Sequence, residues 1–181
     1  MSIERGIMAT INKVRIPKDV TVIKEGSRIK VTGPKGTLSR IMQYPSISIT
    51  FNENDVVIST DSVKKELVAL CGTFAAHIKN MCKGVTEGYS YKMKVVYSHF
   101  PIQLKMAGNK LEINNFLGEK NPRFARIESD VKVTLGNDEL TIFGIDKQSV
   151  GTTASNIEHA TKIRYRDPRV FQDGIYLVER A

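Results

Sequence analysis

The chain has 181 residues, of which 41% are hydrophobic and 25% charged, and it carries a net charge of +8. This composition excludes a disordered chain and leaves one ordinary domain or two small ones. No apolar run approaches the ~18 residues of a membrane span and no secretory signal pattern is visible, so we expect a cytoplasmic protein with no membrane partner. The positive charge favours an anionic partner, nucleic acid before a membrane surface.

The positive charge is unevenly distributed. Residues 1–40 hold nine basic and three acidic residues, and residues 41–63 hold three acidic and no basic ones. Residues 64–110 hold eight basic and two acidic residues, whereas residues 111–181 hold ten basic and eleven acidic ones. The last segment is therefore close to neutral, and anion binding there would depend on local clusters of cations.

The first half of the chain is predicted to begin with short strands. Apolar and polar residues alternate on both sides of a turn at 25–27, which is typical of two paired strands. Residues 33–37 are interpreted as a tight turn, because they lack the residue order and the following helix of a phosphate-binding loop. Residues 47–58 predict a hairpin around a polar turn.

One amphipathic helix is predicted to follow these strands. From Val63 to Ile78 the apolar residues recur at helical spacing. Asp61 or Ser62 is the expected N-cap, and Gly84 is expected to end the helix. Cys71 lies on the apolar face and is expected to be buried, while Cys82 is expected to be a bystander near the helix end.

The second half repeats the pattern of the first at an offset of 82 to 84 residues. Residues 16–22 resemble 100–104, residues 26–31 resemble 108–113, and residues 49–58 resemble 133–142. The apolar helix positions also align: Leu67, Cys71 and Phe74 with Val150, Ala154 and Ile157. An internal duplication explains four segments in the same order, although two generic strand–helix units would give a similar pattern.

The sequence thus predicts an α+β protein of two duplicated small domains, each an antiparallel sheet packed against one helix. We expect the first domain at residues 1–86 and the second at residues 87–181. Asp146 is the expected N-cap of the second helix.

No catalytic or metal-binding pattern is visible in the sequence. His77, His99 and His159 are far apart, and Cys71 and Cys82 do not form a CxxC pair. We therefore expect no cofactor, no small-molecule substrate and no enzymatic activity.

Two segments of the second half combine cations with aromatic residues. The first, 118–126, is expected to have irregular backbone because it contains glycine and proline. The second, 162–176, carries four cations interleaved with Tyr165, Phe171 and Tyr176. Arginine forks suit phosphate oxygens and aromatic rings can stack on unpaired bases. Both segments could instead be solvated loops, and Tyr176 could simply end a last strand. On the second helix, Thr152, Ser155 and Asn156 form either a face that meets RNA or an ordinary polar face.

Three motifs resemble a known family. Leu70-Cys71-Gly72-Thr73, followed by Ile78-Lys79-Asn80-Met81 and the stretch Gly84 to Tyr89, is similar to the universal large-subunit ribosomal protein six family, called protein nine in eukaryotes. The tail from Arg166 to Arg180, with Asp173-Gly174-Ile175-Tyr176-Leu177, and the stretch Asn115 to Lys120 resemble its archaeal and eukaryotic branch.

The resemblance implies a structural protein of the large ribosomal subunit, built from two duplicated domains. It implies that the second domain contacts large-subunit rRNA near the factor-binding region beside the sarcin–ricin loop, that the first domain reaches outward, and that other large-subunit proteins are neighbours. Carried onto this chain, the RNA-binding candidates are Lys120, Asn121, Arg123, Arg126, Lys147, Ser155, Lys162, Arg164, Arg166, Arg169, Phe171, Gly174 and Tyr176.

Two alternatives of other classes remain open from the residues alone. A soluble enzyme would need an inter-domain cleft with titratable groups of perturbed pKa. A protein–protein adaptor would pair its sheets edge to edge with a partner.

Overall fold

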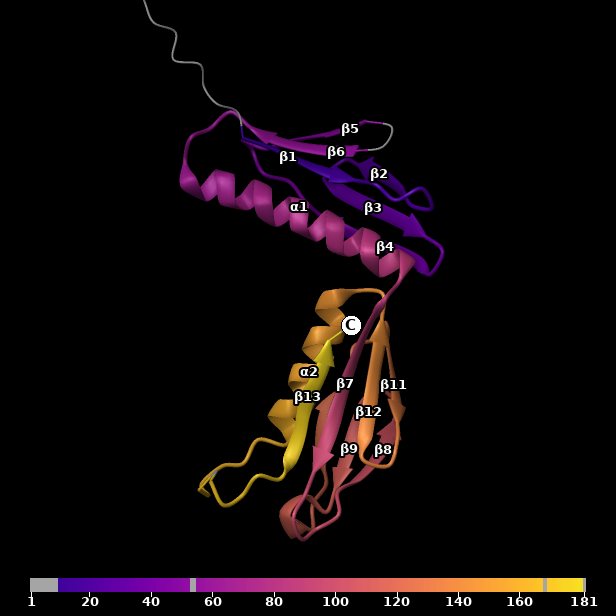
Figure 1. Cartoon of the computed structure of the whole chain (residues 1–181), viewed down its shortest axis with the longest axis vertical. Coiled ribbons are helices and arrows are strands. Elements are labelled where there is room, and N and C mark those ends of the chain that lie inside the picture. The colour runs from indigo at the N-terminus through magenta and orange to yellow at the C-terminus, as the bar shows by residue number, and fades with distance from the viewer. Residues whose placement is uncertain (1–9, 53–54, 168, 181) are drawn as a thin grey trace, which may run out of the picture. The chain divides into compact units, whose positions relative to one another are not determined.

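The computed structural model describes residues 10–52, 55–167 and 169–180, and the chain divides into two compact units, Met1–Glu87 and Gly88–Ala181 (Figure 1). The described part of the first unit forms β1 (Thr10–Arg15), β2 (Thr21–Glu25), β3 (Arg28–Gly33), β4 (Gly36–Ile41), β5 (Ser48–Phe51), β6 (Asp55–Thr60) and α1 (Lys65–Thr86).

Two antiparallel sheets, ordered β1-β6-β5 and β2-β3-β4, share the core of the first unit with helix α1. Alternation along β6 sends Val56 and Ile58 inward, as the predicted hairpin requires. Helix α1 places Cys71, Ile78 and Cys82 in the same core. Cys71 is thus buried as predicted, but Cys82 is a core residue and not a bystander.

The predicted ends of the first helix were wrong. Lys64 occupies the N-cap position and makes no side-chain capping hydrogen bond, whereas Ser62 Oγ accepts from the Lys64 N–H at 3.3 Å in the preceding turn. The helix also continues through the buried Gly84 to Thr86. Packing against the neighbouring hairpin explains this extension, because the Val85 carbonyl accepts from the Lys35 N–H at 2.9 Å.

The described part of the second unit repeats this order of elements. It forms β7 (Tyr89–Val96), β8 (Gln103–Ala107), β9 (Lys110–Asn114), a short 3-10 turn (Phe116–Gly118), β10 (Arg123–Arg126), β11 (Val131–Leu135), β12 (Glu139–Gly144), α2 (Lys147–Ala160) and β13 (Gly174–Arg180).

Helix α2 begins and packs as the sequence predicted. The Asp146 carboxylate accepts from the backbone N–H groups of Gln148 and Ser149, each at 3.2 Å, which satisfies two donors at the helix start. The inward side of α2 is fully or almost fully buried at Val150, Ala154 and Ile157. The helix packs on both sheets of the unit, ordered β11-β12-β7-β13 and β10-β9-β8.

The strand orders confirm a duplicated α+β fold. Sheet β1-β6-β5 corresponds to β7-β12-β11, and β2-β3-β4 corresponds to β8-β9-β10. The equivalent turns even share a left-handed glycine, with φ of 63° at Gly26 and 60° at Gly108. The described part of each unit, however, forms two small sheets where a single sheet was expected. Strand β13 pairs antiparallel with β7 and has no equivalent among the described residues of the first unit.

Candidate nucleic-acid interface

The two basic segments predicted from the sequence lie against each other in the second unit. The Arg123 guanidinium, from the first segment, donates to the Ala160 carbonyl at 3.0 Å and to the Lys162 carbonyl at 3.2 Å. These carbonyls belong to the end of α2 and the start of the second segment. Arg123 is 37 residues before Ala160 and 39 before Lys162 in the sequence, so the fold joins two distant segments into one surface.

Arg123 holds this junction through three kinds of contact. Besides the two carbonyls, its Nε donates to Glu119 Oε2 at 2.8 Å, and its guanidinium lies 4.3 Å from the centre of the Phe116 ring. The hydrogen bond and charge of Arg123, with the charge of Arg166, hold the pKa of Glu119 below its usual range. The contact therefore stabilises the fold at neutral pH, and this stabilisation is lost as the pH falls through the lowered pKa.

The backbone of the first segment differs from the prediction. Residues 123–126 form strand β10, paired antiparallel with β9, and only the stretch before it is irregular. Lys120 and Asn121 are exposed in that stretch, and Arg126 is exposed on the strand. The Arg126 carbonyl accepts from Asn156 Nδ2 at 3.0 Å, which ties the strand to helix α2.

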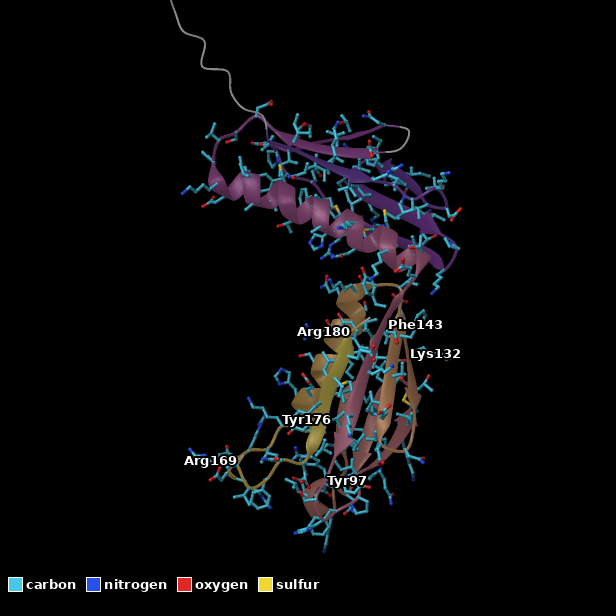
Figure 2. All side chains as sticks on the ribbon, in the orientation of Figure 1. Tyr97, Lys132, Phe143, Arg169, Tyr176 and Arg180 are labelled. Carbon is cyan, nitrogen blue, oxygen red and sulfur yellow. The ribbon has the colours of Figure 1, made fainter. Side chains whose placement is uncertain are left out.

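The second segment presents its cations on an irregular loop between α2 and β13. Arg164 and Arg169 are exposed, and Figure 2 shows Arg169 on this loop, away from the sheet. The Arg166 guanidinium lies 4.8 Å from the centre of the half-buried Phe171 ring. Tyr165 is fully exposed and has a left-handed φ of 61°. These side chains face solvent where a phosphate backbone could reach them.

Gly174 and Tyr176 lie at the start of β13 and support each other. A Cβ at Gly174 would be 2.9 Å from the ring Cζ of Tyr176, so the glycine leaves the space that this ring fills. The Tyr176 hydroxyl donates to the Gln172 carbonyl at 3.2 Å, and the ring remains 46% exposed. Tyr176 is therefore both part of a last strand and available at the surface.

Thr161 fixes the loop at both of its ends. Its buried hydroxyl accepts from the Ile175 N–H at 3.1 Å, and it also approaches the carbonyls of Ile157 and Glu158 at 3.3 and 3.2 Å. This one side chain connects the last turn of α2 to the first residues of β13.

Replacing Thr161 by Val is expected to destabilise the protein by about 1–3 kcal/mol, because the buried Ile175 N–H loses its acceptor while the side-chain shape is kept. Urea unfolding followed by circular dichroism measures this change. Thr134→Val, at an exposed position of β11, should change the free energy of unfolding by less than about 0.5 kcal/mol. An equal effect of the two substitutions would contradict the role given to Thr161.

Two candidate residues lie apart from this surface. Lys147 begins α2 and its ammonium is 5.9 Å from the centre of the Tyr89 ring. The helix rises about 1.5 Å per residue, so Lys147 is about 20 Å from Ala160 at the other helix end. Ser155 is exposed in the middle of the same helix.

The sequence prediction overlooked cations on the sheet itself. Lys94 on β7 is exposed and is the register partner of Tyr176 on β13. Lys132 on β11 is also exposed, and Figure 2 shows it on the same sheet. The alternation of Lys92 and Lys94 with buried Tyr91, Met93 and Val95 would have indicated a strand with a basic face.

The described residues contain no group of three His, Cys, Asp or Glu side chains that could hold a metal ion. No helix in the described ranges is both long and apolar enough to span a membrane.

Comparisons with known proteins agree with the duplicated fold. The family model for ribosomal protein L6 matches residues 16–88 and 100–174, one match in each unit. A large ribosomal subunit protein uL6 from Methanospirillum hungatei is 58% identical over 168 residues, covering 93% of this chain and 96% of that protein. Proteins of the same name from Methanothrix thermoacetophila and Methanosarcina mazei are 52% and 48% identical, covering 94% and 93% of this chain and 97% and 96% of theirs. The chain belongs to the ribosomal protein L6 family.

Proposed function

We propose that this protein binds large-subunit, 23S-type rRNA through its second unit, near the factor-binding region beside the sarcin–ricin loop. Family membership makes the chain a structural protein of the large ribosomal subunit in the cytoplasm and not an enzyme. The finer proposal rests on one observation. The segment from Lys162 to Arg180 ends in β13, a strand that the described part of the first unit lacks, and it carries a cluster of cations and aromatic rings.

The chemistry of this surface suits a folded RNA. Arg164, Arg166 and Arg169 can each present two parallel N–H donors to phosphate oxygens. Lys120 and Arg126 extend the basic surface onto the first segment, which Arg123 holds in place. Because the whole region 111–181 is nearly neutral, these clustered cations and not the overall charge would direct binding. Lys147 and Ser155 would form a second contact along α2, and neighbouring large-subunit proteins would contact the first unit.

The proposal is tested by the salt dependence of rRNA binding. We expect the full chain to bind 23S rRNA of Methanospirillum hungatei with a log–log slope of about −3 to −5 between 50 and 300 mM salt, since four to six phosphate contacts each contribute about 0.7–0.9. Filter binding gives the affinity, and hydroxyl-radical footprinting should protect nucleotides beside the sarcin–ricin loop. An affinity that does not change with salt would refute phosphate-directed binding. Protection of nucleotides only in other parts of the rRNA would refute the proposed binding position beside the sarcin–ricin loop.

A further inference from the structure

A hollow of about 520 Å³ lies between the end of α2, the basic loop and the start of β13. Its apolar walls come from Ile163, Phe171, Ile175 and Tyr176, and Lys162 stands at its edge. Small ligands generally occupy pockets of about 300–1,000 Å³, so this hollow is large enough for one nucleotide. The hydrogen bonds and ring contacts described above lie around this hollow and leave its interior open.

The aromatic walls are held in place before any ligand arrives. The Tyr176 ring fills the space left by Gly174 and its hydroxyl donates to the Gln172 carbonyl. Phe171 is fixed through its N–H, which donates to the Asp167 carbonyl at 3.0 Å, and through the guanidinium of Arg166 on its ring. Preformed walls reduce the conformational entropy that the protein loses when a ligand binds.

The charge around the hollow selects the kind of occupant. Lys162 lines the hollow, and the Arg166 guanidinium lies over the ring of Phe171, another lining residue, so two cations stand beside the apolar interior. Glu158, the acidic side chain in the lining, is engaged by the Leu177 N–H at 3.0 Å. An apolar, aromatic interior beside phosphate-binding groups matches an unpaired nucleotide, because its base is flat and its phosphate is anionic.

We propose that this hollow receives one unstacked base of the rRNA, which lies against Phe171 and Tyr176 while its phosphate contacts Arg166 or Lys162. The inference rests on the proposed function and adds a feature to it: the RNA presents a single base that is turned out of its helix. The phosphate contacts set affinity, and the hollow selects the shape of the RNA.

A tryptophan placed in the hollow tests the proposal directly, because the chain contains no Trp. In Phe171→Trp the new indole remains an aromatic wall, and its fluorescence should be quenched when 23S rRNA of Methanospirillum hungatei binds and a base stacks on it. Tyr44→Trp, at an aromatic position of the first unit, is the control and should keep its emission. Quenching of the Phe171→Trp variant by a purified large-subunit protein without RNA would overturn the proposal in favour of a protein occupant.

Affinity and salt dependence supply the second measurement. Phe171→Leu and Tyr176→Leu should each weaken rRNA binding about 5- to 100-fold, the range expected for one lost base–aromatic stack. The salt slope of the Tyr176→Leu variant should stay at the wild-type value, because Tyr176 itself makes no phosphate contact. Tyr44→Leu should bind like the wild type.

These outcomes separate the two proposals. Wild-type chain that fails to bind the rRNA refutes the proposed function, and the nucleotide site with it. Wild-type binding together with unquenched indole emission of Phe171→Trp and unchanged affinity of the leucine variants refutes the nucleotide site alone. Circular dichroism shows whether each variant folds, and if a leucine variant does not fold, the emission of Phe171→Trp decides.

Discussion

Replacing Arg164, Arg166 and Arg169 together by Gln is expected to weaken binding to large-subunit rRNA about 100- to 500-fold at 100 mM salt. Each lost phosphate contact removes about 0.7–0.9 from the log–log salt slope, so the slope should become shallower by about 2–3. Titrations of the full chain at four salt concentrations measure both quantities. The three side chains are exposed on the loop before β13, so the fold should tolerate the change.

A matched control distinguishes local contacts from overall charge. Arg15, Lys24 and Arg28 are exposed cations of the first unit, and replacing them by Gln lowers the net charge by the same three units. If the second unit is the main RNA-binding unit, this control should retain most of the affinity. Equal losses in the two triple variants would show that rRNA responds to total charge, and would contradict the assignment to the loop.

The second large effect is expected at Gly33, at the end of β3. A Cβ there would lie 2.6 Å from Val85 Cγ2 and 3.0 Å from the Val85 carbonyl oxygen on α1. Because a backbone atom is among the obstacles, Gly33→Ala should separate the β3–β4 hairpin from the helix and destabilise the protein by about 2–3 kcal/mol. Denaturant unfolding measures the loss.

The opposite result is expected at Gly72 on the exposed side of α1, where an added Cβ would meet no atom within 4 Å. Gly72→Ala should stabilise the protein by about 0.5–1 kcal/mol, because glycine in a helix interior is less favourable than alanine. The two Gly→Ala substitutions thus differ in sign. Two effects of the same sign would contradict the packing described for Gly33.

Local patterns were sufficient to predict most of the fold. Alternation predicted β2, β3, β5 and β6 and their equivalents in the second unit, whereas the segment that forms β10 was expected to be irregular. Asp146 predicted the start of α2, and the spacing of Val150 and Ile157 predicted its buried side. The ends of α1 were mispredicted because they depend on tertiary packing. The helix continues past Gly84 since Val85 packs on Gly33 and accepts from Lys35, and neither contact is visible in local sequence.

For the candidate interface, the sequence suggests a set of residues but not their arrangement. The cations of both segments stand out in the sequence, yet the role of Arg123 as the connection between them depends on contacts with Glu119, Ala160 and Lys162. The hollow arises only when α2, the loop and β13 are brought together. Gly174 was proposed as an RNA contact; in the fold it is buried and provides the space for the Tyr176 ring, and the RNA contact stays a prediction. The RNA contacts themselves stay predictions.

Strand β13 also affects how the free protein behaves before it joins a ribosome. It is the last strand of its sheet, and an outer strand with a regular row of unpaired N–H and C=O groups can add strands from another molecule. The pairing of β13 with β7 is irregular between Leu177 and Glu179, and the strand ends in the charged Glu179 and Arg180. Glu179 also accepts from Lys92 Nζ at 2.7 Å. The same strand that carries Tyr176 to the proposed RNA surface is thereby poorly suited to self-association, which favours a free protein that stays monomeric before assembly.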